Sequence, residues 1–146
     1  MAELTRTSTD VEVAPFLARF LVIRSSGYLE QTVFEVARGY VNGKSGGLVR
    51  SFAHSWLEKT RNPTADNLRQ LVGRFDQSLR EEFDDLMSDD DERLSRELAF
   101  LIDRRNQIAH GLSEGINRGK ALALKEVATD LADWFILKYN PARTTV

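Results

Sequence analysis

Residues 101–111 read LIDRRNQIAHG, where two arginines, an asparagine and a histidine end an apolar helix pattern. Leu94, Leu98, Leu101, Ile102 and Ile108 share one helix face, because Leu98 and Leu101 follow at four- and three-residue spacing and Ile108 lies seven residues after Leu101. Gly111 stands where a helix commonly ends in the left-handed conformation. On an unbroken helix four polar side chains share one side, away from the apolar face: Asp103, Asn106, Gln107 and His110. The stretch therefore predicts an amphipathic helix with a polar row near its end.

The rest of the chain repeats this helical spacing, and no run alternates apolar and polar residues as a half-buried strand does. We expect the first helix to be capped by Ser8–Asp10, with Pro15 within its opening turns. The expected helices cover about 10–41, 48–60, 65–87, 91–110 and 120–139. The fold class is then all-α, an antiparallel bundle of about five helices with a long first helix. We expect one domain over residues 1–146, with loose tails at 1–9 and 141–146.

At two segments the sequence does not decide whether a helix continues or is interrupted. Ser25-Ser26-Gly27 either breaks the first helix or lets a neighbouring helix approach one long rod, and we favour the rod. Gly73 either divides the segment 65–87 or lies within it. The apolar side chains expected to face the core in the first two helices are Val13, Phe16, Leu17, Phe20, Leu21, Leu29, Val33, Val36, Ala37, Tyr40, Val41, Phe52, Trp56 and Leu57.

Composition narrows the class of protein. The chain has no cysteine, so it has neither disulfides nor a thiolate metal site, and we expect a reducing, cytoplasmic environment. Its start is polar, and no apolar run approaches the roughly 18–20 residues that span a bilayer. We therefore expect a soluble protein without a membrane partner.

Charge is distributed unevenly although the net value is only −2. Eight of the 22 acidic residues lie in Glu81–Glu92, so the other residues carry 14 acidic against all 20 basic side chains. The window Arg93–Lys125 is itself basic. This is compatible with a polyanionic partner, although a run of charge is most often a solvated helix face.

His110 and the neighbouring arginines carry groups that suffice for cleaving RNA without a metal. Histidine transfers protons near neutral pH, and arginine suits phosphate oxygens. In such a reaction a neighbouring 2′-hydroxyl attacks phosphorus while a cation stabilises the developing charge. Arg105 and His110 are separated by about 140° on an ideal helix, so one copy does not bring both to one point. Two copies about a two-fold axis would, and the motif therefore predicts a homodimer.

Arg105–His110 fits the R-x-x-x-x-H signature of the HEPN superfamily (higher eukaryote and prokaryote nucleotide-binding). The run LIDRRNQIAHG, followed by a final amphipathic helix, resembles the stand-alone bacterial HEPN proteins of the RiboL-PSP type. Residues 20–37, FLVIRSSGYLEQTVFEVA, are similar to the opening helix of that type.

The resemblance implies an all-α bundle whose homodimer places two motifs in one cleft, often with metal-independent endoribonuclease activity in toxin or phage-defence systems. By this carry-over Arg105 contacts phosphate, His110 is the acid/base, and Asn106 orients the histidine or the RNA backbone. Arg104 lies outside the motif and is a second phosphate candidate, and Glu30 is a candidate auxiliary acid partner. We expect RNA as a partner, and neither a cofactor nor a metal.

The alternative is a non-catalytic HEPN module for dimerisation or for nucleotide or protein binding. It could be one half of a two-gene toxin–antitoxin pair, whose partner is a cognate antitoxin or nucleotidyltransferase. His54 has no acid/base companion nearby in the sequence, and we interpret it as a surface or partly packed histidine. We interpret the acidic run as solvated helix caps, because it lacks the spacing of a calcium loop.

Overall fold

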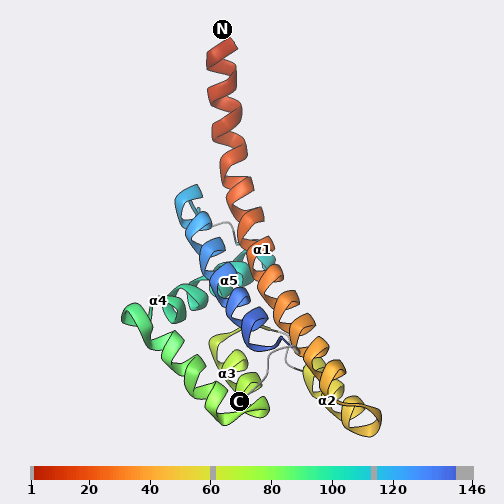
Figure 1. The fold of residues 1–146 in the computed structure, drawn as a ribbon. Helices are drawn as coiled ribbons and strands as arrows, with labels where there is room; N and C mark the ends of the chain where they lie inside the picture. The colour runs from red at the N-terminus through yellow and green to blue at the C-terminus, as the bar shows by residue number, and fades with distance from the viewer. Residues whose placement is uncertain (1, 60–61, 113–114, 141–146) are drawn as a thin grey trace.

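The computed structural model describes residues 2–59, 62–112 and 115–140, with side chains from residue 15 onward. This part of the chain contains only helices and no strand. The helices are α1 (Ala2–Lys44), α2 (Gly47–Lys59), α3 (Ala65–Phe75), α4 (Gln77–Ala109) and α5 (Arg118–Lys138). The predicted all-α bundle with a long first helix is confirmed (Figure 1). None of the described helices is long and apolar enough to cross a membrane.

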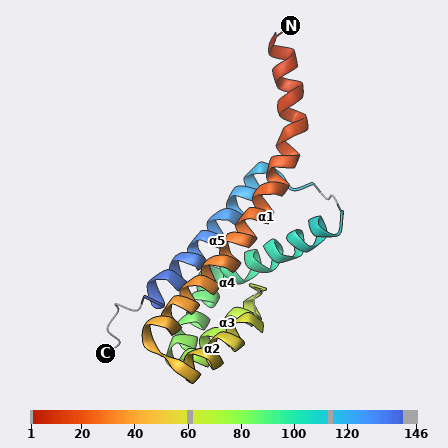
Figure 2. The same cartoon turned by 90° about the vertical axis from the view of Figure 1, so that its right-hand side faces the viewer.

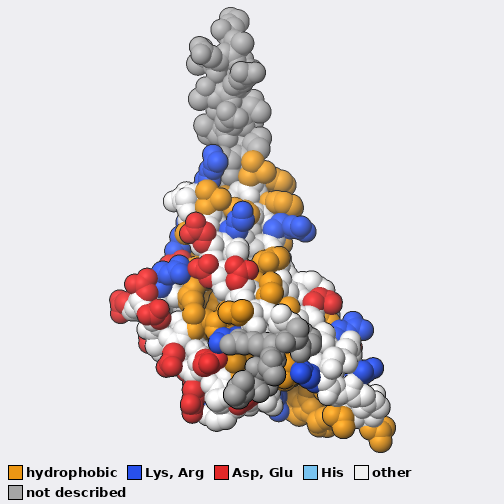
Figure 3. Space-filling model, in the orientation of Figure 1, with side chains coloured by type: hydrophobic (Ala, Val, Ile, Leu, Met, Phe, Trp, Pro, Cys, Tyr) orange, Lys and Arg blue, Asp and Glu red, His pale blue; other side chains and the backbone are white. Residues whose placement is uncertain are grey.

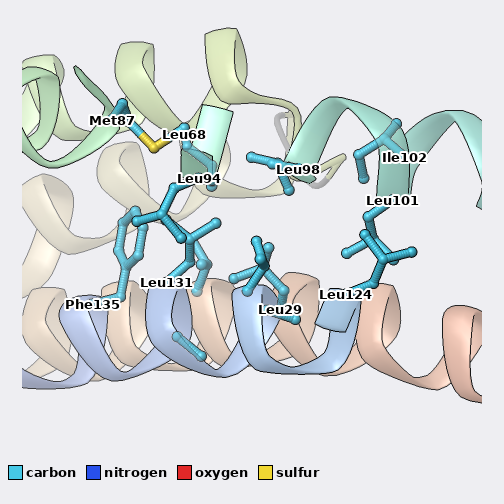
Figure 4. Packing of buried hydrophobic residues seen from close by; sticks show 14 of the residues in the cluster. Leu29, Leu68, Met87, Leu94, Leu98, Leu101, Ile102, Leu124, Leu131 and Phe135 are labelled. Carbon is cyan, nitrogen blue, oxygen red and sulfur yellow. The ribbon is translucent and has the colours of Figure 1, made fainter. Parts of the chain in front are cut away.

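The helices form two layers around one apolar core. α1 and α5 lie side by side in one layer, α3 and α4 form the other, and α2 folds back along the end of α1 (Figures 1 and 2). Figure 4 shows the core between the layers, where Leu98 and Leu101 of α4 face Leu29 of α1 and Leu124 of α5. All four side chains are fully buried. The polar row of α4 is therefore carried by a helix whose opposite side is fixed in the core.

α1 and α5 run in parallel, whereas the predicted bundle was antiparallel. Residues 21–28 of α1 line a groove with residues 125–129 of α5, and further along both helices the ring centroids of Tyr40 and Tyr139 are 5.8 Å apart. The α3–α4 hairpin is antiparallel, as its Arg69–Asp84 ion pair of 2.8 Å shows. The parallel pair arises because the second part of α4 crosses the α1–α5 layer, which returns the chain to the side where α5 starts (Figure 2).

α1 is one continuous helix through Ser25-Ser26-Gly27, as we favoured. Ser26 is fully buried, which is consistent with small residues admitting a neighbouring helix. The start of α1 differs from the prediction. The helix begins at Ala2, so Ser8–Asp10 is not its cap, residues 2–9 are helical, and Pro15 lies inside the helix. Residues 2–14 contain no glycine or proline that would stop a helix before this point.

Two breaks divide the segment between α2 and Gly111. α3 ends and α4 begins at Asp76, three residues after the glycine that we considered as a divider. The backbone N–H of Asp76 bonds to the carbonyl of Val72 (3.0 Å), and its carboxylate accepts from the N–H of Ser78 (2.8 Å). The hydrogen bond from the N–H of Ser78 lowers the pKa of Asp76. One aspartate therefore ends one helix and caps the next.

A second break lies inside α4, between the helices predicted to end near residue 87 and to start near residue 91. Asp89 is extended (ψ 152°), and Asp90, Asp91 and Glu92 have positive φ angles of 49°, 54° and 59°. Asp91 and Glu92 are therefore in a left-handed turn and not in a first helical turn, which corrects the prediction. Such angles cost roughly 1–2 kcal/mol per residue relative to the right-handed form. The turn divides α4 into two arms, 77–88 and 93–109.

Several apolar side chains expected in the core are exposed. Phe16, Leu17 and Phe20 are 64%, 55% and 54% exposed, whereas Ala18 between them is buried, so the three large side chains lie off the covered face of α1. On α2, Leu57 is buried, but Phe52 is 67% exposed because α2 leaves a gap toward α3. Trp56 is half-exposed beside the same gap. Val13 and the tail 141–146 lie outside the described side chains and residues.

Candidate functional site at the end of α4

The second arm of α4 directs Arg105 toward α1. Leu98 and Leu101 hold this arm in the core, and Arg105 follows one turn later. Its Nη1 donates long hydrogen bonds to Ser26 Oγ (3.4 Å) and Asn62 Oδ1 (3.5 Å), and lies 3.7 Å from Glu30 Oε2. Arg105 thus joins α4, α1 and the connection between α2 and α3. Its side chain remains 30% exposed, so the guanidinium is anchored but not sealed.

Asn62 is itself fixed by the start of α3. Its carbonyl accepts from Asn67 Nδ2 (2.9 Å) and from the N–H of Thr64 (2.9 Å). Thr64 is the N-cap of α3, and its hydroxyl accepts from the N–H of Asn67 (3.1 Å). The loop that contacts Arg105 is therefore held by a capped helix.

His110 is the C-cap residue of α4 and is exposed. Its backbone N–H bonds to the carbonyl of Asn106 (3.1 Å), and Gly111 follows with φ 75°. The N–H of Leu112 then bonds to the carbonyl of Gln107 (2.9 Å). The predicted left-handed glycine cap is confirmed, and it leaves the imidazole at an exposed helix end.

The polar row lies on α4 beside this end. Gln107 Nε2 donates to Asp103 Oδ2 (2.9 Å), and Gln107 Oε1 accepts from Arg104 Nη1 (3.2 Å). The guanidinium of Arg104 also lies over the ring of Phe100, 4.7 Å from its centroid. Asn106 is exposed. Arg104 is thus partly used in packing, whereas Asn106 and His110 face solvent.

The structure pairs Arg105 with Glu30, two of the five predicted site residues, and gives them different surroundings from His110. Arg105 is held against α1, while His110 is exposed beyond the last turn of α4. Ser26 and Asn62 also contact Arg105 and were missed by sequence reasoning. The sequence did not single them out. A serine beside a glycine in a helix and an asparagine before a proline are both common for purely structural reasons.

Other predicted features lie elsewhere. His54 on α2 is partly buried, and its Nε2 is 2.8 Å from Asn42 Oδ1, which fits the interpretation as a partly packed histidine. Two acidic residues of the left-handed turn pair with nearby arginines, Asp90 with Arg93 (3.6 Å) and Asp91 with Arg96 (3.7 Å). Over residues 2–59, 62–112 and 115–140, no group of three His, Asp or Glu side chains is arranged to hold a metal ion.

A family model described as RiboL-PSP-HEPN matches residues 2–136, which include all of α1 and the segment Arg105–His110. The chain belongs to the RiboL-PSP-HEPN family. Membership confirms the resemblance drawn from LIDRRNQIAHG and from the opening helix. Neither the curated proteins nor the solved structures with which the chain was compared gave a match.

Proposed function

We propose that the chain is a metal-independent endoribonuclease of the toxin or phage-defence type, and that it acts as a homodimer. The observation that carries the proposal is the R-x-x-x-x-H motif of a RiboL-PSP-HEPN chain, with an exposed His110 and a partly exposed Arg105. Many members of the superfamily have this activity, but a fold alone does not establish it.

The proposed chemistry needs only a proton carrier and a cation. The 2′-oxygen of RNA forms a bond to phosphorus as its proton passes to the imidazole of His110. The bond from phosphorus to the 5′-oxygen breaks, and that oxygen takes up a proton. Arg105 stabilises the negative charge on the phosphate oxygens in the transition state. Asn106, one turn before the histidine, orients the imidazole or the RNA backbone.

Dimerisation supplies what one copy lacks. In one copy the guanidinium is held against α1 and the imidazole is exposed at the helix end, so a second motif about a two-fold axis would complete the cleft. The uncovered face of Phe16, Leu17 and Phe20 supports self-association, because contiguous exposed apolar residues commonly mark an interaction surface. We further propose that the enzyme acts in the cytoplasm and that a cognate antitoxin or nucleotidyltransferase restrains it.

A non-catalytic module is the second candidate, and the contacts of Arg105 favour it. An arginine that joins Ser26, Glu30 and Asn62 can serve to connect helices without touching RNA. In that case the motif shapes the bundle and an interaction surface for a nucleotide or a protein.

The ends of the RNA products distinguish these functions. We would incubate the purified wild-type chain with a 5′-labelled single-stranded RNA in EDTA. Attack by the 2′-hydroxyl predicts fragments with 2′,3′-cyclic phosphate and 5′-hydroxyl ends, and no cut where a 2′-deoxynucleotide replaces the ribonucleotide 5′ of the scissile bond. Intact RNA after prolonged incubation at high enzyme concentration would favour the non-catalytic module.

A further inference from the structure

A groove runs along the line where α1 and α5 pack together. It has a volume of about 250 Å³ and is lined by Leu21, Arg24, Ser25, Tyr28, Lys125, Ala128 and Thr129. A second hollow of about 360 Å³ shares Lys125 and Thr129 with it, so the groove continues along α5. Figure 3 shows basic and hydrophobic side chains over the upper parts of α1 and α5, with acidic side chains beside them.

Two cations from different helices line the first hollow, Arg24 of α1 and Lys125 of α5. Both are exposed, and neither forms an ion pair with another described residue. The lining of this hollow contains no carboxylate. Glu126 and Asp130 enter only in the adjoining hollow, where Asp130 is already paired with Arg93 (3.2 Å). The first hollow therefore favours an anion.

Ser25 gives a second, independent indication of a ligand. Its side chain lines the groove and is only 4% exposed, and its hydroxyl has no hydrogen-bond partner among the described residues. Buried hydroxyl groups are normally bonded, so an orphaned one beside a hollow indicates a missing polar partner. Tyr28, which is 47% exposed, lines the groove one turn further along α1 and offers an aromatic ring.

We propose that the α1–α5 groove binds single-stranded RNA outside the cleavage site. A backbone phosphate lies between Arg24 and Lys125, with the hydroxyl of Ser25 as a further donor, and a base stacks on Tyr28. Cations that follow the backbone, combined with aromatic rings that stack on bases, are the usual elements of single-strand binding. The inference rests on the proposed function in that RNA is the ligand. Ser25 lines this groove while Ser26 contacts Arg105, so α1 separates the two sites.

RNA binding by chains that carry His110→Ala tests the groove without cleavage. The probe is a fluorescein-labelled, unstructured 20-nucleotide RNA, and fluorescence anisotropy gives Kd at several salt concentrations. Arg24→Gln with Lys125→Gln is expected to weaken binding about tenfold and to reduce the salt slope by about 0.7 for each phosphate that is no longer neutralised. Tyr28→Leu is expected to weaken binding at least about fivefold without changing that slope.

The matched control replaces two exposed cations on α1 outside the groove, Arg38→Gln with Lys44→Gln, and should leave Kd within about twofold. Ser25→Ala gives a signature that a structural serine would not. It should raise Tm, because the orphaned hydroxyl is removed, and yet weaken RNA binding.

The proposal that the groove binds RNA would be overturned by an unchanged Kd in the Arg24/Lys125 variant, or by an equal weakening in the control. It would also be overturned if the His110→Ala parent did not bind RNA. If free AMP competed as effectively as unlabelled RNA, the ligand of the groove would be a free nucleotide and not an RNA strand. That result would also overturn the proposal. Cleavage by the wild-type chain is measured separately, so a failed groove and a failed nuclease give different results.

Discussion

Glu30 Oε2 lies 3.7 Å from Arg105 Nη1, which pairs a carboxylate of α1 with the arginine of the HEPN motif on α4. Both side chains are 30% exposed, so the pair is accessible to an incoming phosphate. A phosphate that binds Arg105 must compete with this carboxylate. The pair therefore orients the guanidinium and also weakens its attraction for RNA.

Glu30→Gln removes the competing charge, and RNA should bind more tightly to a chain that also carries His110→Ala. Partly exposed ion pairs contribute about 0.2–1 kcal/mol, so the decrease in Kd should not exceed about fivefold. Anisotropy with labelled RNA measures it. Glu35→Gln is the control, because Glu35 is exposed on the same helix and contacts Gln31 instead. Weaker binding by Glu30→Gln would show that the carboxylate supports RNA binding and would contradict competition.

Asp91→Gly should stabilise the fold. Asp91 has φ 54°, which glycine adopts without the steric cost of a side chain, and its ion pair with Arg96 is largely exposed. We expect the free energy of unfolding to rise by up to about 1 kcal/mol, and Tm by about 2–4 °C. Asp89→Gly is the control, since Asp89 has an ordinary φ of −66° and should gain nothing. Equal melting temperatures for the two variants would contradict strain at Asp91.

Tyr139→Phe should remove part of the loss of stability at alkaline pH. Burial raises the pKa of Tyr139 above its ordinary value near 10, so folding favours the neutral phenol. That contribution is complete below the ordinary pKa and is lost as pH rises above it, because only the unfolded chain then ionises freely. Tm measured from pH 8 to 11 should fall less steeply for Tyr139→Phe than for the wild type. Tyr28→Phe, at a half-exposed position, should retain the wild-type slope.

The dimer predicts a molar mass twice the 16.6 kDa of one chain, measured by light scattering. Phe16→Ser with Phe20→Ser should shift the mass toward the monomer and leave Tm nearly unchanged, because both side chains are more than half exposed. Leu137→Ser is the control at a similarly exposed apolar position on α5. A wild-type chain that remains a monomer at micromolar concentration would remove the basis for a shared cleft.

The sequence predicts the helices well where apolar spacing continues and less well where backbone angles decide. Unbroken spacing on both sides of Ser25-Ser26-Gly27 indicates one rod, which α1 is. The same continuity hides the break at Asp76, because Val72, Phe75 and Leu79 keep helical spacing across it. The left-handed turn at Asp90–Glu92 has no glycine to reveal it. The parallel packing of α1 and α5 depends on how α4 crosses them, which local spacing does not contain.

The candidate site shows the same division. The cap at Gly111 is local and was predicted from a few residues. The surroundings of Arg105 are not local, because Ser26 and Asn62 come from other elements and reach it only through the packing of α4 on α1. Glu30 was named from the sequence as a candidate, but its partner follows only from the structure.

Cleavage of a labelled single-stranded RNA by the wild type, His110→Ala and His54→Ala tests the central claim most directly. The two histidines form a matched pair, because His54 lies on α2 and contacts Asn42, away from the motif. In EDTA the wild type and His54→Ala should cleave at equal rates, and His110→Ala should be slower by about 10²–10⁴-fold, the usual contribution of a proton-transfer group. Cleavage by His110→Ala at the wild-type rate would contradict the assignment of this histidine and of the site around it.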